Sequence, residues 1–137
     1  MVYKTFEDLD VYKIAREFRK KLYCLSKQLP EYEKYSLANQ IRRAAVSLTN
    51  CIAEGHGRFH YQENIQFLRQ SRDSLQELID DINVCIDEKY ADGNQLNELK
   101  NEGYIVLKKL NGYIKYLQKS KSQITKPKTL EQNYLTV

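Results

Sequence analysis

Residues 36–56 read SLANQIRRAAVSLTNCIAEGH, and apolar side chains recur through this stretch every three or four residues. That is the period of one face of an α-helix. The apolar face consists of Leu37, Ile41, Ala45, Leu48 and Ile52. A strip of small residues (Ala44, Cys51 and Gly55) flanks it and would let another helix approach closely, which favours oligomerisation. We expect Gly55 and Gly57 to end the helix.

Three further segments show the same periodicity, at residues 8–29, 61–89 and 94–119. Thr5 and Asp8 have the spacing of a capping box at the start of the first one. The connections at 30–35, 57–60 and 90–93 are short, and short loops between long helices predict antiparallel neighbours. The sequence therefore predicts an all-α fold, an antiparallel up-down-up-down four-helix bundle over residues 1–119. Residues 120–137 are expected to form a basic, polar, flexible tail.

The composition narrows the class of protein. Only 5 Gly and 2 Pro occur among 137 residues, which disfavours a turn-rich all-β fold. No apolar run approaches the roughly 18 residues of a membrane span, and no signal-peptide pattern opens the chain. Three cysteines without C-x-x-C spacing are typical of reduced thiols. We therefore expect a soluble, cytoplasmic protein that makes no membrane contact.

Charge is distributed unevenly along the chain. Residues 1–60 hold 11 Lys/Arg against 7 Asp/Glu, residues 61–99 hold 3 against 9, and residues 100–137 hold 8 against 2. Helical geometry gathers basic residues into two outer stripes, which are candidate nucleic-acid-binding surfaces. The first stripe is Lys13, Arg16, Lys20 and Lys27, and the second is Lys100, Lys108, Lys115 and Lys119. The alternative is that both stripes are solvated faces whose positive charge compensates the negative charge of residues 61–99.

Polar residues also follow the face of residues 36–56 that lies opposite the apolar one. We interpret them as a structural polar network with partners from the third helix, while a subunit seam or a ligand surface is the alternative. The candidate members are Arg42, Arg43, Asn50, Glu54, Arg72 and Glu77. The expected pairings are Glu77 with Arg42 or Arg43, and Arg72 with Glu54.

No set of residues has the spacing of a catalytic site. His56 and His60 are four apart, but the glycines beside them are expected to break the helix, so we predict no metal site. Asp80 and Asp81 are adjacent, so their side chains point about 100° apart around a helix and would not form a metal-binding pair. The sequence therefore predicts no enzyme, no cofactor and no catalytic residue. Six tyrosines are candidates for stacking on bases: Tyr3, Tyr12, Tyr23, Tyr32, Tyr35 and Tyr61. The commoner role of tyrosine is half-buried packing.

The stretch QIRRAAVSLTNCIAEGHGR at residues 40–58 resembles the four-helix-bundle proteins encoded in intervening sequences of bacterial 23S rRNA genes. FEDLDVYKIA at 6–15 and FLRQSRDSLQEL at 67–78 extend the resemblance. That family is similar in fold to the accessory variability determinant proteins of diversity-generating retroelements. Those are basic pentamers that bind a reverse transcriptase and nucleic acid. The resemblance implies a homopentamer, and it supplies no catalytic residues.

Together these observations favour a nonenzymatic, oligomeric scaffold that binds RNA or DNA through its basic surfaces. A retroelement reverse transcriptase is a candidate partner. The alternative is a protein-interaction or ribosome-associated four-helix module that has no affinity for nucleic acid.

Overall fold

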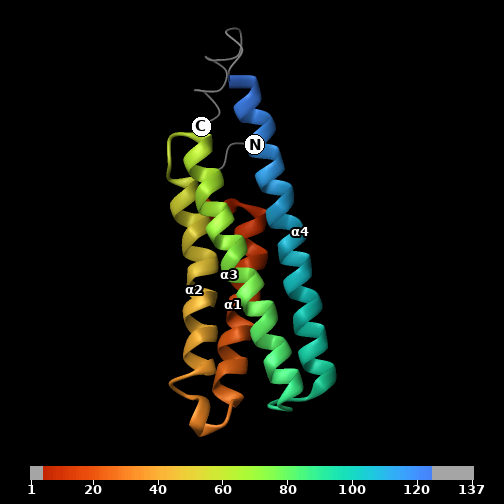
Figure 1. Cartoon of the computed structure of the whole chain (residues 1–137). Coiled ribbons are helices and arrows are strands. Elements are labelled where there is room, and N and C mark those ends of the chain that lie inside the picture. Colours follow the sequence, from red (N-terminus) through yellow and green to blue (C-terminus); the bar gives the residue numbers. More distant parts are fainter. Residues whose placement is uncertain (1–4, 125–137) are drawn as a thin grey trace.

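The computed structural model describes residues 5–124, and within this range every regular element is helical. Residues 5–124 contain four α-helices, and two short 3-10 helices precede the first and second of them (Figure 1). Their bounds are η1 Phe6–Asp8, α1 Asp10–Gln28, η2 Glu31–Glu33, α2 Leu37–His56, α3 Tyr61–Asp87 and α4 Gly93–Ile124. The predicted all-helical class and the four helices are confirmed.

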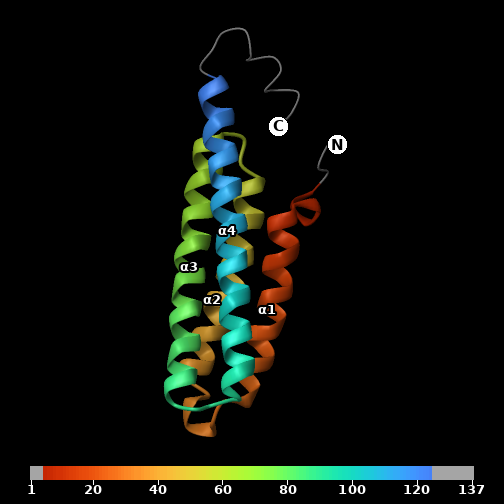
Figure 2. The ribbon, with the colours of Figure 1, turned by 90° about the vertical axis from the view of Figure 1, so that its right-hand side faces the viewer.

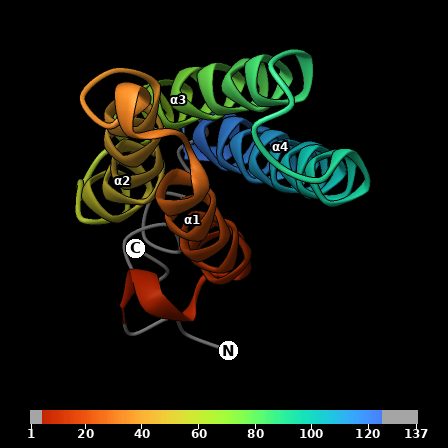
Figure 3. The same cartoon turned by 90° about the horizontal axis from the view of Figure 1, so that it is seen from below.

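The four helices surround one hydrophobic core, to which each contributes an apolar stripe (Figure 3). Side chains with almost no solvent exposure come from all four helices, among them Phe18, Ile41, Leu75 and Leu110. The most extensive contacts join α2 to α3, and the least extensive join α1 to α4. The seam between α1 and α4 is therefore the most open side of the bundle.

The capping box at Thr5 forms, but it starts η1 and not α1. The Thr5 hydroxyl accepts from the Glu7 amide, and the Asp8 carboxylate accepts from the Thr5 amide at 3.2 Å. Leu9 then adopts an extended backbone conformation and buries its side chain. Burial of Leu9 separates the two elements, so α1 begins at Asp10.

The small residues of α2 are used inside the chain. A Cβ on Gly55 would lie 2.6 Å from Asn64 Oδ1 and 2.9 Å from Phe67 Cβ, both on α3. Beside this contact, the Ser71 hydroxyl donates to the Leu48 carbonyl at 2.6 Å. The small strip thus brings α3 close to α2, and it gives no support to the oligomerisation expected from it. Gly55 also does not break the helix, which continues to His56.

The longest helix, α4, extends beyond the N-terminal end of α1 (Figure 2). It continues to Ile124, so the predicted end of the bundle at residue 119 is five residues too early. No glycine or proline lies between Lys119 and Ile124. Lys121 additionally donates to Gln62 of α3 at 3.1 Å, which helps to hold this end. The remainder of the predicted tail, residues 125–137, lies outside the described residues.

Candidate nucleic-acid interface

The basic stripe predicted on the first helix faces solvent along α1. Lys13, Arg16, Lys20 and Lys27 are all exposed, because the opposite side of α1 carries the buried Val11–Leu25 seam. Lys20 forms a helix-surface pair with Glu17 at 3.2 Å. Among the described residues no ion pair involves the other three. The stripe therefore presents positive charge that is little compensated by local acids.

The second basic stripe lies on α4. Lys108, Lys115 and Lys119 are exposed, whereas Lys100 is half-buried. From Gly103 to Ile124 the helix contains five lysines and no acidic residue. Lys109 and Lys121 belong to this set, although the sequence interpretation did not select them. Lysines near a helix C-terminus also interact favourably with the helix dipole, so this helix end tolerates the clustered charge.

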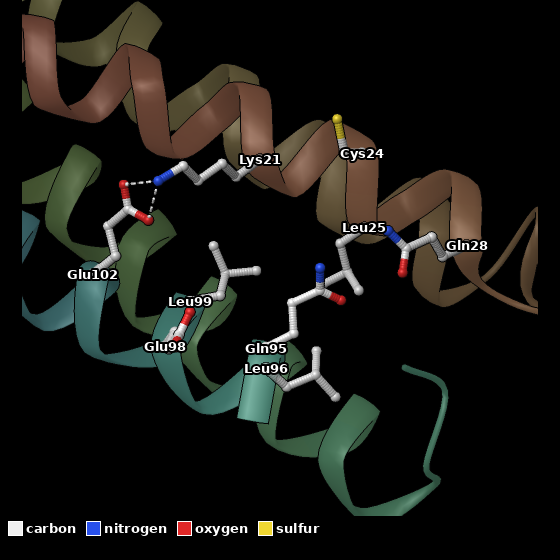
Figure 4. Close-up of a pocket in the computed structure, with 9 residues that line it drawn as sticks. All are labelled: Lys21, Cys24, Leu25, Gln28, Gln95, Leu96, Glu98, Leu99 and Glu102. Atoms are coloured by element: carbon white, nitrogen blue, oxygen red, sulfur yellow. Dashed lines mark hydrogen bonds and ion pairs between the residues drawn. The ribbon is translucent and has the colours of Figure 1, made fainter. Parts of the chain in front are cut away.

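A groove lies where α1 and α4 meet (Figure 4). Its volume is about 340 Å³, and Leu25, Leu96 and Leu99 form its apolar floor. Lys21 of α1 reaches across and donates to both carboxylate oxygens of Glu102, at 3.0 and 2.9 Å. The rim of the groove therefore carries this ion pair and a further carboxylate at Glu98.

The ion pair between Lys21 and Glu102 is expected to add little stability. Lys21 is largely exposed, and exposed pairs contribute about 0.2–1 kcal/mol. A double-mutant cycle with Lys21→Met and Glu102→Gln, followed by urea unfolding, should give a coupling free energy in that range. A coupling above about 2 kcal/mol would mean that the clamp is a major tie between α1 and α4.

The polar residues of α2 do not form the predicted network. Arg43, Asn50, Glu54 and Glu77 are exposed, and Arg42 is half-buried. No ion pair among the described residues joins Glu77 to Arg42 or Arg43, or Arg72 to Glu54. The α2 side chains instead line an open depression together with Tyr23 of α1 and Gln70 of α3. The polar side chains of α2 therefore face an open surface depression and do not pair with one another inside the bundle.

Arg72 makes its contact on the other side of α3. Its Nη1 donates to Asn111 Oδ1 of α4 at 2.9 Å. Other polar side chains join α2 to its neighbours, and of these Ser47 belongs to the polar face noted in the sequence. Arg19 of α1 donates to the Thr49 hydroxyl at 2.8 Å, and Ser74 of α3 donates to Ser47 at 2.9 Å. Such interhelical bonds leave no pattern in a single sequence.

Burial shifts the pKa of several titratable side chains. Burial raises the pKa of Cys51. The hydrogen bond with Ser47 lowers this pKa, and the charge of Glu54 raises it further. Burial, with the charges of Asp81 and Glu33, raises the pKa of Cys85 to about 11. Burial lowers the pKa of His56, and Asp8 partly opposes this. In residues 5–124, no three His, Cys, Asp or Glu side chains are grouped so that they could hold a metal ion.

The tyrosines considered for base stacking mostly have structural roles. Tyr12, Tyr23 and Tyr61 pack against the core. Tyr32 is exposed, and its hydroxyl donates to Tyr90, which in turn donates to Glu33 at 2.7 Å. Tyr35 is exposed, and Tyr3 lies outside the described residues. The other tyrosines exposed on helices are Tyr104 and Tyr116, both on α4.

The fold and its surfaces define a small all-helical bundle with basic outer faces on α1 and α4. Residues 7–112 match the model of the 23S rRNA-intervening sequence protein family. Because the match covers most of the chain, the protein belongs to this family. None of the curated proteins compared with the chain matches it. No helix in the described part of the chain is long and apolar enough to cross a membrane.

Proposed function

We propose that this protein is a nonenzymatic scaffold that binds RNA or DNA through the lysines of α4 and the basic stripe of α1. Its framework is an antiparallel up-down-up-down four-helix bundle. The observation that carries the proposal is the exposed, acid-free lysine face of α4 between Gly103 and Ile124. Such a face attracts phosphates from any sequence, and its affinity falls as salt rises.

Two further features support phosphate binding. The exposed lysines Lys108, Lys115 and Lys119 take part in no ion pair within the described chain, so binding a phosphate would break no existing contact there. Along the sequence the acids precede the lysine face, with 9 of them between residues 61 and 99. Separated charge of this kind steers an anionic polymer towards one side of the molecule.

We propose that the protein acts as an oligomer in the cytoplasm, with a homopentamer as the expected state. A closed ring would repeat each basic stripe in every subunit and would strengthen the field that a nucleic acid meets. Resemblance to the accessory proteins of retroelements suggests a reverse transcriptase as a protein partner. The polar depression on α2 and the groove between α1 and α4 are surfaces available for such contacts.

A second candidate function is a protein-interaction or ribosome-associated module without affinity for nucleic acid. The observation that favours it is the groove between α1 and α4, with its apolar floor and polar rim. Apolar pockets rimmed by polar residues are typical of protein contacts. On this alternative the lysines of α4 serve solubility alone.

Charge reversal on α4 separates the two functions. Changing Lys100, Lys108, Lys115 and Lys119 to glutamate should lower affinity for RNA and duplex DNA by about 100-fold or more near 0.1 M salt. A matched pair of double variants controls for net charge. Lys115→Glu with Lys119→Glu should weaken binding strongly, whereas Lys34→Glu with Arg69→Glu, which leaves both stripes intact, should weaken it much less. Equal losses in the two double variants would show that net charge alone governs binding.

A further inference from the structure

The outer face of α4 carries aromatic rings as well as lysines. Tyr104 is 49% exposed and Tyr116 is 63% exposed, although both lie on a helix that packs against the core. The ring of Tyr116 is nearly parallel to that of Tyr113, with 6.3 Å between their centroids. This neighbour limits the conformations of the Tyr116 side chain, so part of the entropy of ordering the ring is lost before any ligand binds.

The two rings flank the lysines. At 100° per residue, Tyr104 and Tyr116 are about 120° apart around the helix, and Lys108, Lys115 and Lys119 fall within the sector between them. Along the helix axis the two tyrosines are about 18 Å apart. We call these five residues (Tyr104, Lys108, Lys115, Tyr116 and Lys119) the α4 ridge. It combines aromatic faces with positive charges over about four turns of exposed helix.

This alternation matches the chemistry of an unpaired strand. Proteins that bind single-stranded nucleic acid place bases on aromatic side chains and phosphates on basic ones. In a duplex the bases are stacked within the helix, so tyrosine rings on a convex surface gain nothing from them, whereas lysines still contact the phosphates. We propose that the α4 ridge binds single-stranded RNA or DNA, with bases stacked on Tyr104 and Tyr116. This inference rests on the proposed function and specifies its ligand.

A protein partner fits the α4 ridge less well. Lysine is depleted from the buried centres of protein interfaces, and here three unpaired lysines share the sector of the helix surface that the rings bound. Ile105 is also exposed, at 63%, and it is the other large apolar side chain exposed on the described part of α4. The charged members of the α4 ridge are all lysines, as a phosphate backbone requires.

The test compares two ligands and three variants of the full chain. The ligands are an oligothymidine of about 16 nucleotides and a duplex DNA of equal length. Tyr104→Leu with Tyr116→Leu should lower affinity for oligothymidine about tenfold or more, because each stacked ring contributes substantially to binding. Duplex affinity should change less than about twofold, since only the lysines contact the duplex. Tyr104→Phe with Tyr116→Phe should keep the wild-type affinity for both ligands, and Tyr35→Leu serves as the control for loss of an exposed tyrosine elsewhere.

Three outcomes would overturn the inference. If the double leucine variant binds oligothymidine like wild type while the lysine reversals abolish binding, the lysines bind phosphate without stacking and the proposed function stands. If the leucine variant changes the mass of the oligomer in solution and leaves affinity unchanged, the rings form a contact between copies. If wild-type protein binds neither ligand at low salt, the proposed function itself fails, and this inference fails with it.

Discussion

Changing Asp81 to asparagine is expected to stabilise the protein by about 2 kcal/mol near pH 8. Asp81 lies on α3 and is only 6% exposed, and its Oδ2 has no hydrogen-bond partner among the described residues. Burial, with the nearby charges of Glu77 and Asp80, raises the pKa of Asp81 from 3.8 to about 6. An ionised carboxylate is therefore held in an unfavourable environment at neutral pH, and a neutral amide of similar shape removes that penalty.

The stabilisation should depend on pH with a definite sign. The folded state binds the Asp81 proton more tightly than the unfolded state does. The favourable contribution of the protonated group is therefore complete below about pH 4 and is lost as pH rises through about 6. The difference in unfolding free energy between Asp81→Asn and wild type should grow across this window. Urea unfolding of both proteins from about pH 4 to pH 8 measures it, and a difference that does not vary with pH would show that Asp81 has an ordinary pKa.

Changing Gly55 to alanine is expected to lower the free energy of unfolding by about 1–3 kcal/mol. The added Cβ would lie 2.6 Å from Asn64 Oδ1 and 2.9 Å from Phe67 Cβ, so α2 and α3 would have to move apart. Phe67 Cβ is held by the α3 backbone, so a rotamer change cannot relieve that contact. The overpacking outweighs the gain of about 1 kcal/mol that alanine normally brings to a helix interior.

Gly112 provides the matched control, because it also lies inside a helix. A Cβ at Gly112 would meet nothing within 4 Å. Gly112→Ala should therefore raise the free energy of unfolding by about 0.5–1 kcal/mol. Thermal and urea unfolding of the two variants should thus give shifts of opposite sign. Stabilisation by both alanines would contradict the close approach of α2 to α3 at Gly55.

The helices were predictable because their signals are local. Apolar residues at spacings of three and four gave the four segments, and their bounds agree with the structure to within two residues except at the end of α4. That end was placed too early because the apolar seam stops at Leu117, whereas polar residues without helix breakers continue the helix to Ile124. The stripe on α1 and three lysines on α4 were likewise placed correctly on exposed faces, since exposure follows from the position of the apolar seam.

Contacts between helices were not predictable in the same way. The small strip of α2 could face either a second chain or α3, and periodicity does not distinguish them. Arg72 was assigned to Glu54 by charge alone, but its guanidinium lies on the α4 side of α3 and pairs with a neutral amide, Asn111. Which polar groups meet depends on the rotation of each helix within the bundle, and that is set by the packing of all four seams together.

The exposed tyrosines of α4 were missed for a related reason. Tyrosine commonly packs with its ring half-buried, and Tyr113 follows that rule. Tyr104 and Tyr116 lie on the same helix but point away from the core. These two tyrosines indicate a binding surface only when their exposure is considered together with the neighbouring lysines.

The most direct test of the proposed function is a salt series with the wild-type protein. Binding to a structured RNA and to duplex DNA would be measured from low to physiological salt, with the mass of the protein measured in the same samples. We expect an oligomer whose affinity falls steeply and linearly on a log–log scale, as counterion release requires. Absence of binding at the lowest salt would contradict the proposal and leave the basic stripes of α1 and α4 as solvated surface.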